Sequence, residues 1–431
     1  MKIAIISQGC AANFGDGEKL ARKLLQETLS KGEPAPEIVF TANPNSATDA
    51  LCATDANRAP DAFYLNVCTV KGNAGALKLL RNTTEKFPKA RIYITGCAPK
   101  DFREEALRIC PSVTFPDAAN GEENLHHPKL RENSFIGIVN IEEGCLDACS
   151  FCSTHLVKGR LRSYSPEIIV KNVAALVADG CKEIQLTGQD CGCYGFDIGT
   201  NLAELAQKIL VHVPGDYRIR LGMGNPRHIL QYKDALLECY KDERVYKFIH
   251  LPVQSGSESV LKGMNRRHTV QDYEILAESF QKEFPLFTLS TDIIVGFPGE
   301  TEQDFEATCN LVRNTRPTVC NITRFVARAG TVAAKFDDAS NYPPVPDSMK
   351  HSRSAALADI FQKVAQENNS HWIGHEEFVV VEKSGYREGT TIARNSAYRP
   401  VAIQGSFPIG QKLHVRITDA EPFALIGEVI A

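Results

Sequence analysis

The sequence lacks the long apolar stretches that mark membrane and secreted proteins. Hydrophobic residues make up 43% of the 431 residues, yet no segment approaches the roughly 18 consecutive apolar residues that span a bilayer. The N-terminal run Met1–Ile6 is too short for the core of a signal peptide, and the run 423–430 is interrupted by Glu428. We therefore expect a cytoplasmic protein without a membrane partner.

A strong charge of one sign is also missing. The formal net charge is −4 and charged residues make up 23% of the chain, which is ordinary for a globular protein. This balance gives no general attraction for nucleic acid, so DNA is not an expected partner and any RNA-binding surface has to be local. The length predicts about two to four domains.

Cysteine is abundant instead, with 14 residues, and without an export signal it indicates metal ligation rather than disulfides. Cys145, Cys149 and Cys152 form a CxxxCxxC pattern directly after the strand-like run 136–141. Thiolates ligate iron–sulfur clusters, and three of them leave one iron of a cubane open to a small molecule. A zinc site with His155 as fourth ligand and a structural disulfide are the alternatives.

Three more cysteines, Cys10, Cys68 and Cys97, each follow a predicted strand in the N-terminal segment. The strands at 2–7, 63–67 and 91–95 are each followed by a helical pattern, which predicts a parallel α/β sheet. Carboxyl ends of parallel strands share one edge, so we expect these cysteines to converge and to hold a second cluster. The alternative is that each of these cysteines is a small hydrophobic residue buried in its strand. We apply that interpretation to the remaining isolated cysteines: Cys52, Cys110, Cys181, Cys239, Cys309 and Cys320.

The central segment again alternates strands and helices. Ser165 and Pro166 open one helix, which Gly180 ends. Glycine and polar residues follow every strand, which places the expected active site at the carboxyl ends. The six predicted strands are fewer than the eight of a closed barrel and lie at 136–141, 183–187, 217–221, 246–251, 289–295 and 319–325.

The C-terminal segment reads as a small antiparallel β-barrel. A helix over 349–371 leads to five short β-rich runs, at 377–382, 390–393, 399–403, 412–417 and 423–430. From Trp372 on, six Lys and Arg face seven Asp and Glu, so charge does not favour RNA binding here. An oligomerisation or packing barrel is the alternative.

The CxxxCxxC pattern, with Phe151 before its third cysteine, resembles the signature of radical S-adenosylmethionine (SAM) enzymes. The blocks QGCAANFGDGE, LNVCTV and ITGCA resemble the cysteine blocks of the methylthiotransferase N-terminal domain, and the terminal barrel resembles the TRAM domain. The resemblance implies two 4Fe–4S clusters and SAM. It also implies an α/β architecture with an N-terminal parallel-sheet domain (1–130), a partial (βα)6 radical-SAM barrel (133–365) and a TRAM-like RNA-binding barrel (372–431).

The same resemblance assigns the site residues. Cys145, Cys149 and Cys152 would bind the catalytic cluster and Cys10, Cys68 and Cys97 the auxiliary one. SAM contacts are carried over to Phe151, Gln189, Asp190, Asn225, Gln254 and Ser255. The sequence departs from the family at Gly17 (usually Ser), at 71–75 (no acidic residue) and at His155 (often Arg), none of them a ligand.

RNA contacts are expected from basic loops beside the active site. The candidates are Lys158, Arg160, Arg162, Arg266 and Arg267, with Lys262 and His268 beside the last two and Arg324 and Arg328 on a third loop. These side chains would hold the phosphate backbone of a tRNA anticodon loop. An electron donor such as a flavodoxin or ferredoxin is a further expected partner.

The phrases LRSY, GQDCGCYGFD, RLGMGNP, HLPVQSGS and NITRFVARAGT resemble most closely the archaeal and eukaryotic branch of the methylthiotransferases. That branch adds a methylthio group to adenine C2 of N6-threonylcarbamoyladenosine at tRNA position 37. A C–H bond of this kind is unactivated and requires radical chemistry carried by a cofactor. The alternatives are an isopentenyladenosine substrate, a ribosomal-protein aspartate, or a non-catalytic iron–sulfur RNA-binding protein.

Overall fold

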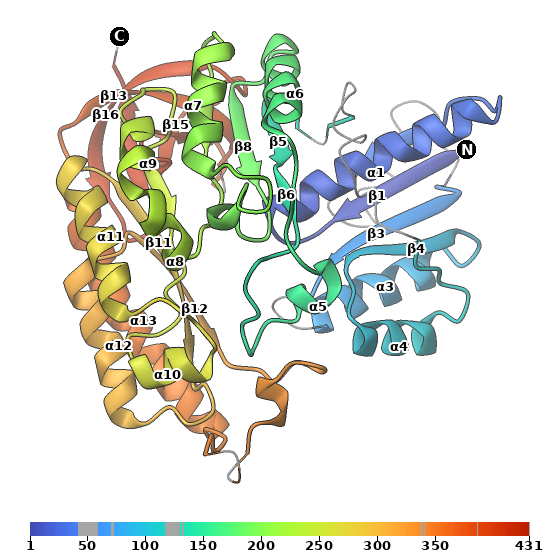
Figure 1. Cartoon of the computed structure of the whole chain (residues 1–431). Coiled ribbons are helices and arrows are strands. Elements are labelled where there is room, and N and C mark those ends of the chain that lie inside the picture. Colours follow the sequence, from blue (N-terminus) through green and yellow to red (C-terminus); the bar gives the residue numbers. More distant parts are fainter. Residues whose placement is uncertain are drawn as a thin grey trace. The chain divides into compact units, whose positions relative to one another are not determined.

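A computed structural model describes residues 1–41, 59–69, 73–116, 130–131, 133–337, 339, 341–385 and 387–430 (Figure 1). They form two compact units, Met1–Asp147 with Cys152–Gln189 and Ala148–Phe151 with Asp190–Ala431. Cys52 and Lys71, on which two of the sequence interpretations rest, lie outside the described residues. No helix in the described ranges is long and apolar enough to cross a membrane.

The first unit contains a parallel sheet with the strand order β2-β1-β3-β4, as the strand–helix pattern predicts. Its elements are β1 (Lys2–Ser7), α1 (Ala11–Ser30), β2 (Glu37–Phe40), β3 (Ala62–Cys68), α3 (Ala74–Lys86), β4 (Arg91–Cys97) and α4 (Lys100–Ile109). Side chains alternate between the two faces of a strand. Ile3 and Ile5 therefore pack on Leu20 of α1, whereas Ile6 and Phe63 pack in the cluster formed with α3 and α4.

The same unit continues with a second, smaller parallel pair. β5 (Ile136–Asn140) and β8 (Glu183–Thr187) are joined through α6 (Pro166–Ala178), which begins with Pro166 as predicted. Between them, β6 (Glu142–Glu143) and β7 (Arg162–Ser163) form a short antiparallel pair. The chain between these two strands carries the CxxxCxxC pattern and α5 (Thr154–Lys158).

The second unit holds the remaining central strands. β10 (Phe248–His250), β11 (Thr288–Val295) and β12 (Val319–Arg324) form a parallel sheet, and β9 (Arg218–Arg220) also lies in this unit. Capping boxes at Thr269 and Thr301 start α11 (Val270–Glu283) and α12 (Glu302–Thr315). The other elements are η2 (Cys191–Cys193), α7 (Leu202–His212), α8 (Pro226–Ile229), η3 (Leu230–Tyr232), α9 (Lys233–Tyr240), α10 (Glu258–Gly263) and η4 (Ala333–Lys335). All six predicted central strands are therefore present, two in the first unit and four in the second.

The second unit ends in a closed five-stranded barrel, which α13 (Asp347–Ser370) precedes (Figure 1). Its strands are β13 (Glu376–Ser384), β14 (Thr390–Arg394), β15 (Pro400–Gln404), β16 (Lys412–Ala420) and β17 (Leu425–Val429), in the order β13-β14-β15-β17-β16. The expected barrel is confirmed, but it is not wholly antiparallel, because β15 and β17 pair in parallel. A closed ring with an odd number of strands cannot alternate direction at every pair.

Candidate functional site

Three cysteines lie at the carboxyl edge of the N-terminal sheet. Cys68 and Cys97 are the last residues of β3 and β4 and are directly opposed across these two strands. Cys10 follows β1 and is the N-cap residue of α1. Gly9 has a φ of +99°, and a Cβ there would come 2.6 Å from the Cys68 sulfur, so this close approach requires glycine. The structure thus brings together the three cysteines that the strand pattern places at one edge.

The chemistry of this triad fits a metal centre. Burial raises the pKa of the Cys97 thiol to about 12; Cys68 and Cys10 raise it further, and Lys158 opposes them. Three thiols this close resist joint ionisation, and a bound cation that displaces their protons removes the repulsion. No disulfide bond is formed among the described cysteines. The donor set therefore fits an iron–sulfur cluster with one iron left open.

A buried network of charged residues adjoins the triad. Lys158 Nζ lies 2.7 Å from Asp16 Oδ2, and Asn140 Nδ2 donates to Asp16 Oδ1 at 2.8 Å. Lys19 is buried, donates to the Tyr164 hydroxyl at 3.3 Å and lies 3.6 Å from Glu143 Oε1. The Tyr164 hydroxyl in turn donates to Glu143. Sequence analysis did not find this network, because its members come from four separate segments.

The position of Lys158 corrects one of the RNA assignments. Its side chain is 8% exposed and its ammonium is paired with Asp16 inside the first unit. Burial alone would lower the pKa of Lys158, but Asp16 together with Cys97 and Glu143 outweighs burial and raises it, so the side chain stays cationic. A cation held in this way is not a surface contact for a phosphate backbone.

The CxxxCxxC loop is anchored to the first unit around Cys145. The Cys145 amide donates to the Gly159 carbonyl, and its sulfur accepts a hydrogen bond from the Asp147 amide at 3.4 Å. Gly144 has a φ of +79°, and a Cβ there would collide with the carbonyl of Arg160. The Gln189 side chain, assigned to SAM by resemblance, accepts from the Gly144 amide at 2.7 Å and so supports this loop.

The part of the loop around Cys149 belongs to the second unit. The Ser150 amide donates to the Met264 carbonyl at 3.0 Å, and Asn265 Nδ2 donates to the Ala148 carbonyl at 2.7 Å. Arg266 Nη1 donates to the Cys149 sulfur at 3.5 Å and its Nη2 to the Pro252 carbonyl at 2.7 Å. N–H donors aimed at cysteine sulfurs suit thiolates that carry the charge of a cluster, so the donor set fits one.

Arg266 is therefore a second correction to the expected RNA contacts. Its guanidinium is partly buried and directed at Cys149, whereas its neighbour Arg267 is exposed. Arg160 is exposed as well, and Arg162 is 60% exposed with its guanidinium 3.7 Å from Glu143. Of the five residues first assigned to RNA, Arg160, Arg162 and Arg267 remain available to phosphate.

Two residues assigned to SAM form a buried pair in the second unit. Asp190 is 3% exposed, and its Oδ1 accepts from the Gly192 amide at 3.1 Å and the Asn225 amide at 2.9 Å. The Asn225 side chain accepts from the Arg227 amide at 3.3 Å and starts α8. His228, fully buried, lies 3.9 Å from the second Asp190 oxygen. Asp190 thus fixes the loop that carries Asn225.

The remaining candidates lie after β10 and on the cysteine loop. Gln254 has a φ of +77°, a left-handed conformation that is costly for a residue other than glycine and that occurs often at functional sites. Ser255 is 1% exposed, and its hydroxyl lies 3.3 Å from that of Thr308. The Phe151 ring packs in a hydrophobic cluster with Val260, Met264, Phe297, Phe325 and Ala333.

A polar group on three adjacent strands was not found from the sequence. Asp292 Oδ1, on β11, accepts from His250 Nε2 of β10 at 3.0 Å and from Asn321 Nδ2 of β12 at 2.8 Å. Burial works to raise the pKa of Asp292, but the bond from His250 and the other partners outweigh it and lower that pKa. An aspartate within the apolar run TLSTDIIV was the signal that sequence reasoning passed over.

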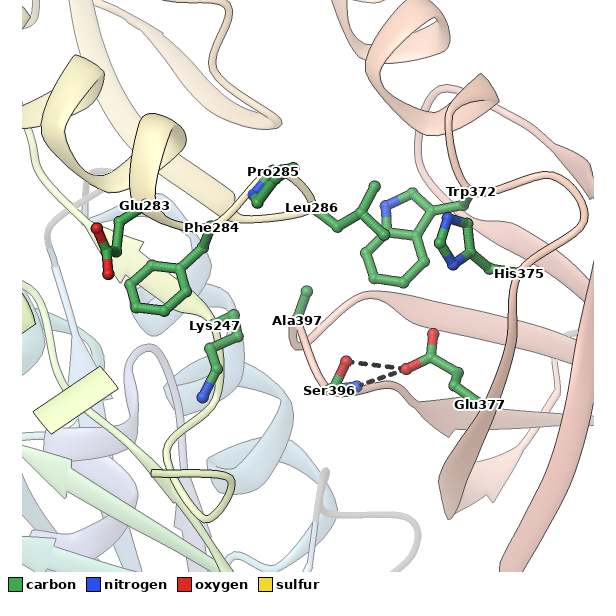
Figure 2. Close-up of a pocket in the computed structure, with 10 residues that line it drawn as sticks. All are labelled: Lys247, Glu283, Phe284, Pro285, Leu286, Trp372, His375, Glu377, Ser396 and Ala397. Atoms are coloured by element: carbon green, nitrogen blue, oxygen red, sulfur yellow. Dashed lines mark hydrogen bonds between the residues drawn. The ribbon is translucent and has the colours of Figure 1, made fainter. Parts of the chain in front are cut away.

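The cavity shown in Figure 2 lies elsewhere in the second unit, where β10 and the end of α11 meet the terminal barrel. Its volume is about 580 Å³, and no residue predicted for the cluster, SAM or RNA sites lines it. Burial and the neighbouring Arg218 lower the pKa of Lys247 at its wall to about 8. The Lys247 ammonium donates to the carbonyls of Asp242 and Val245, so this cavity does not add to the site described above.

The other cysteines mostly behave as core residues. Cys110, Cys181, Cys239 and Cys309 are buried as expected, and Cys320 is partly buried. Burial raises the pKa of Cys239 and Cys309 to about 11, which leaves these thiols protonated and unreactive at neutral pH. Cys191 and Cys193, which the sequence left unassigned, are fully buried in η2.

Two family models match the chain, the Radical SAM superfamily over residues 139–312 and the TRAM domain over residues 370–430. The fold and the cysteine sites thus define a radical SAM protein with a TRAM domain. The chain is 36% identical to a probable threonylcarbamoyladenosine tRNA methylthiotransferase of Archaeoglobus fulgidus, over 100% of this chain and 99% of the relative. It is 32% identical to the human threonylcarbamoyladenosine tRNA methylthiotransferase, over 100% of this chain and 74% of that protein. The chain belongs to the threonylcarbamoyladenosine tRNA methylthiotransferase family.

A solved structure supports the fold at lower identity. The radical SAM methyltransferase TsrM of Kitasatospora setae superimposes with a TM-score of 0.53 at 14% identity, over 75% of this chain and 72% of that one. Membership of the radical SAM superfamily implies one 4Fe–4S cluster and SAM. The second cluster, the individual site residues, the three domain boundaries, the electron donor and the cytoplasmic location remain predictions.

Proposed function

We propose that this protein replaces the C2 hydrogen of N6-threonylcarbamoyladenosine at tRNA position 37 with a methylthio group. The observation that carries the proposal is the presence of two separate cysteine triads in a chain related over its full length to enzymes named for this reaction. One triad would serve hydrogen abstraction and the other would hold the sulfur to be inserted. A binding protein with a structural cluster would gain nothing from an open iron at either site.

Bound at Cys145, Cys149 and Cys152, a 4Fe–4S cluster with SAM supplies the one-electron chemistry that an unactivated C–H bond requires. The chain's own contribution is positioning. Gly144 and Gln189 hold the loop on the Cys145 side, and Arg266 donates to Cys149. An external reductant, such as a flavodoxin or ferredoxin, would provide the electron.

The SAM contacts carried over by resemblance divide into two kinds. Asp190 and Ser255 are buried, and they bond to the Asn225 amide and to the Thr308 hydroxyl of α12, which supports a role in positioning for these two. Asn225 and Gln254 lie directly beside them, at the ends of β9 and β10, and we propose that they face the cofactor with Gln189 and the backbone at Phe151. The strained backbone of Gln254 favours this assignment.

For the tRNA, we propose that the exposed Arg160, Arg162 and Arg267 contact phosphates around the anticodon loop. Phosphate contacts by Arg supply much of the affinity for nucleic acid and make it salt-dependent. The polar group of His250, Asp292 and Asn321 offers donors and acceptors of the kind that recognise a modified base.

The test is a reconstitution under anaerobic conditions with SAM, dithionite and tRNA carrying either N6-threonylcarbamoyladenosine or isopentenyladenosine. Mass spectrometry of the digested tRNA should show a gain of a methylthio group on the first nucleoside alone, together with release of 5′-deoxyadenosine. The Cys145, Cys149 and Cys152 to Ala variant is the control and should give neither product. Methylthiolation of the isopentenylated tRNA instead, or of neither, would refute the proposed substrate.

A further inference from the structure

An aromatic pair, Phe378 on β13 and His414 on β16, lies on the outer face of the terminal barrel. Phe378 and His414 are direct cross-strand partners, and their rings stack with centroids 4.7 Å apart and planes inclined by 27°. Their neighbours along each strand, Val379 and Leu413, point into the barrel core. Alternation along the strands therefore turns both rings outward.

Phe378 is exposed far more than packing of the barrel requires, and His414 is partly buried. Phe378 is 50% exposed although it lies within a nine-residue strand, as its third residue. Single exposed apolar residues are common on protein surfaces, and Phe423 at 63% is another in this barrel. Phe423 has only a distant ring contact, with Phe361 at 6.4 Å, whereas Phe378 belongs to a stacked pair.

A cation completes the group. Lys412, two residues before His414 on β16, places its ammonium 5.0 Å from the centre of the Phe378 ring. The next outward cation on the strand, Arg416, is bonded to Glu376 at 2.6 Å and lies 3.7 Å from Glu428. Lys412 therefore stands beside the rings, whereas Arg416 is held by two carboxylates.

We propose that Phe378, His414 and Lys412 form a stacking platform for one unpaired nucleotide of the tRNA, a role that rests on the proposed function. Single-stranded RNA is recognised by unstacked bases laid on aromatic rings, and stacking works for any base because every base has a π-face. The base would lie on the Phe378–His414 pair, and Lys412 would meet the adjoining phosphate. A protein partner would also accept aromatic anchors, but its interface would not change the affinity for tRNA.

The experiment uses the full-length reconstituted protein and measures affinity for threonylcarbamoyladenosine-containing tRNA over a series of salt concentrations. Phe378→Ala should weaken binding about tenfold or more and leave the salt slope unchanged, because stacking is not ionic. Phe378→Trp should restore affinity. Lys412→Gln should reduce the slope by about one, and Phe423→Ala is the matched control that should bind like the wild type.

Wild-type affinity in Phe378→Ala, with Phe378→Trp also unchanged, would overturn the platform. A change of oligomeric state in Phe378→Ala without a change in tRNA binding would overturn it too, in favour of a protein interface. SAM cleavage in the absence of tRNA should be equal in all variants, which shows that they are folded. If the wild type fails to methylthiolate this tRNA while RNA binding still depends on Phe378, the proposed function fails and the platform stands.

Discussion

The two groups of three cysteines are built in opposite ways. Cys145, Cys149 and Cys152 lie on one short loop, and their proximity is a property of spacing alone. Cys10, Cys68 and Cys97 come from three distant segments and meet because β1, β3 and β4 are adjacent parallel strands. The cysteines of the first site are kept near one another by the short chain between them, whereas those of the second meet only when the sheet is folded.

The surroundings of the two sites differ as well. The sheet-edge site has a paired cation nearby, Lys158, which Asp16 holds within the first unit. The loop site has Arg266, which donates directly to the Cys149 sulfur. Sequence analysis assigned both cations to RNA, and in both cases the structure gives them an internal partner. The comparison teaches that a basic residue in a loop next to a cysteine motif can either bind RNA or pair with a residue inside the protein.

The largest effect is expected from removing the loop site. Replacing Cys145, Cys149 and Cys152 with Ala should abolish 5′-deoxyadenosine formation and lower the iron from about eight to about four per chain, if both sites hold cubanes. The remaining iron should keep its spectrum, because the other triad lies on a different element. Iron analysis and electron paramagnetic resonance provide the measurement. Stoichiometric zinc without iron after anaerobic reconstitution would contradict the cluster assignment at both sites.

Removing the sheet-edge site should separate the cleavage of SAM from the transfer of the methylthio group to tRNA. A variant with Ala at Cys10, Cys68 and Cys97 should still cleave SAM, since the loop triad is intact, but should add no methylthio group to tRNA. Both products are measured in one reaction, by chromatography for 5′-deoxyadenosine and mass spectrometry for the nucleoside. Should cleavage vanish in a folded variant that retains the loop cluster, the division of labour between the two sites would be wrong.

The finest test compares two neighbouring arginines. Arg266→Gln removes the donor to Cys149 and should make the loop cluster harder to reduce, since a cation stabilises the more negative state, and should slow SAM cleavage. Arg267→Gln should leave both unchanged and reduce the salt slope of tRNA binding by about one. A redox titration in the background lacking the sheet-edge cysteines reports on the loop cluster alone. Equal reduction potentials of the loop cluster in the two variants would show that Arg266 does not act on that cluster, and would favour its original assignment to RNA.

Local sequence patterns were enough to predict most of the strands and the two groups of three cysteines. All six central strands and all five barrel strands were predicted because each is a short apolar run between turn residues. β2 was missed because it is a four-residue edge strand with no buried position. α1 contains Gly15 and Gly17, although glycine is unfavourable in the interior of a helix.

Tertiary contacts explain why glycine stands at these two positions, and no local sequence pattern reveals such contacts. A Cβ on Gly15 would collide with the Asn140 side chain, and one on Gly17 with the Ser7 hydroxyl. The helix thus lies so close to β5 and β1 that two of its positions exclude a side chain. The positions of Lys158 and Arg266 were unpredictable for the same reason, because Asp16 and Cys149 are their partners only after folding.

The buried network of charged residues in the first unit also bears on how this enzyme could have been assembled from parts. A fragment ending near residue 130 would keep Asp16 and Lys19 but lose Asn140, Lys158, Glu143 and Tyr164, with which they interact. Buried charges separated from their partners destabilise a fold strongly. The sheet-edge triad therefore cannot be exchanged between proteins as the N-terminal sheet alone. The first unit, which runs to Gln189, keeps these partners together, and it also contains Cys145 and Cys152 of the cysteine loop.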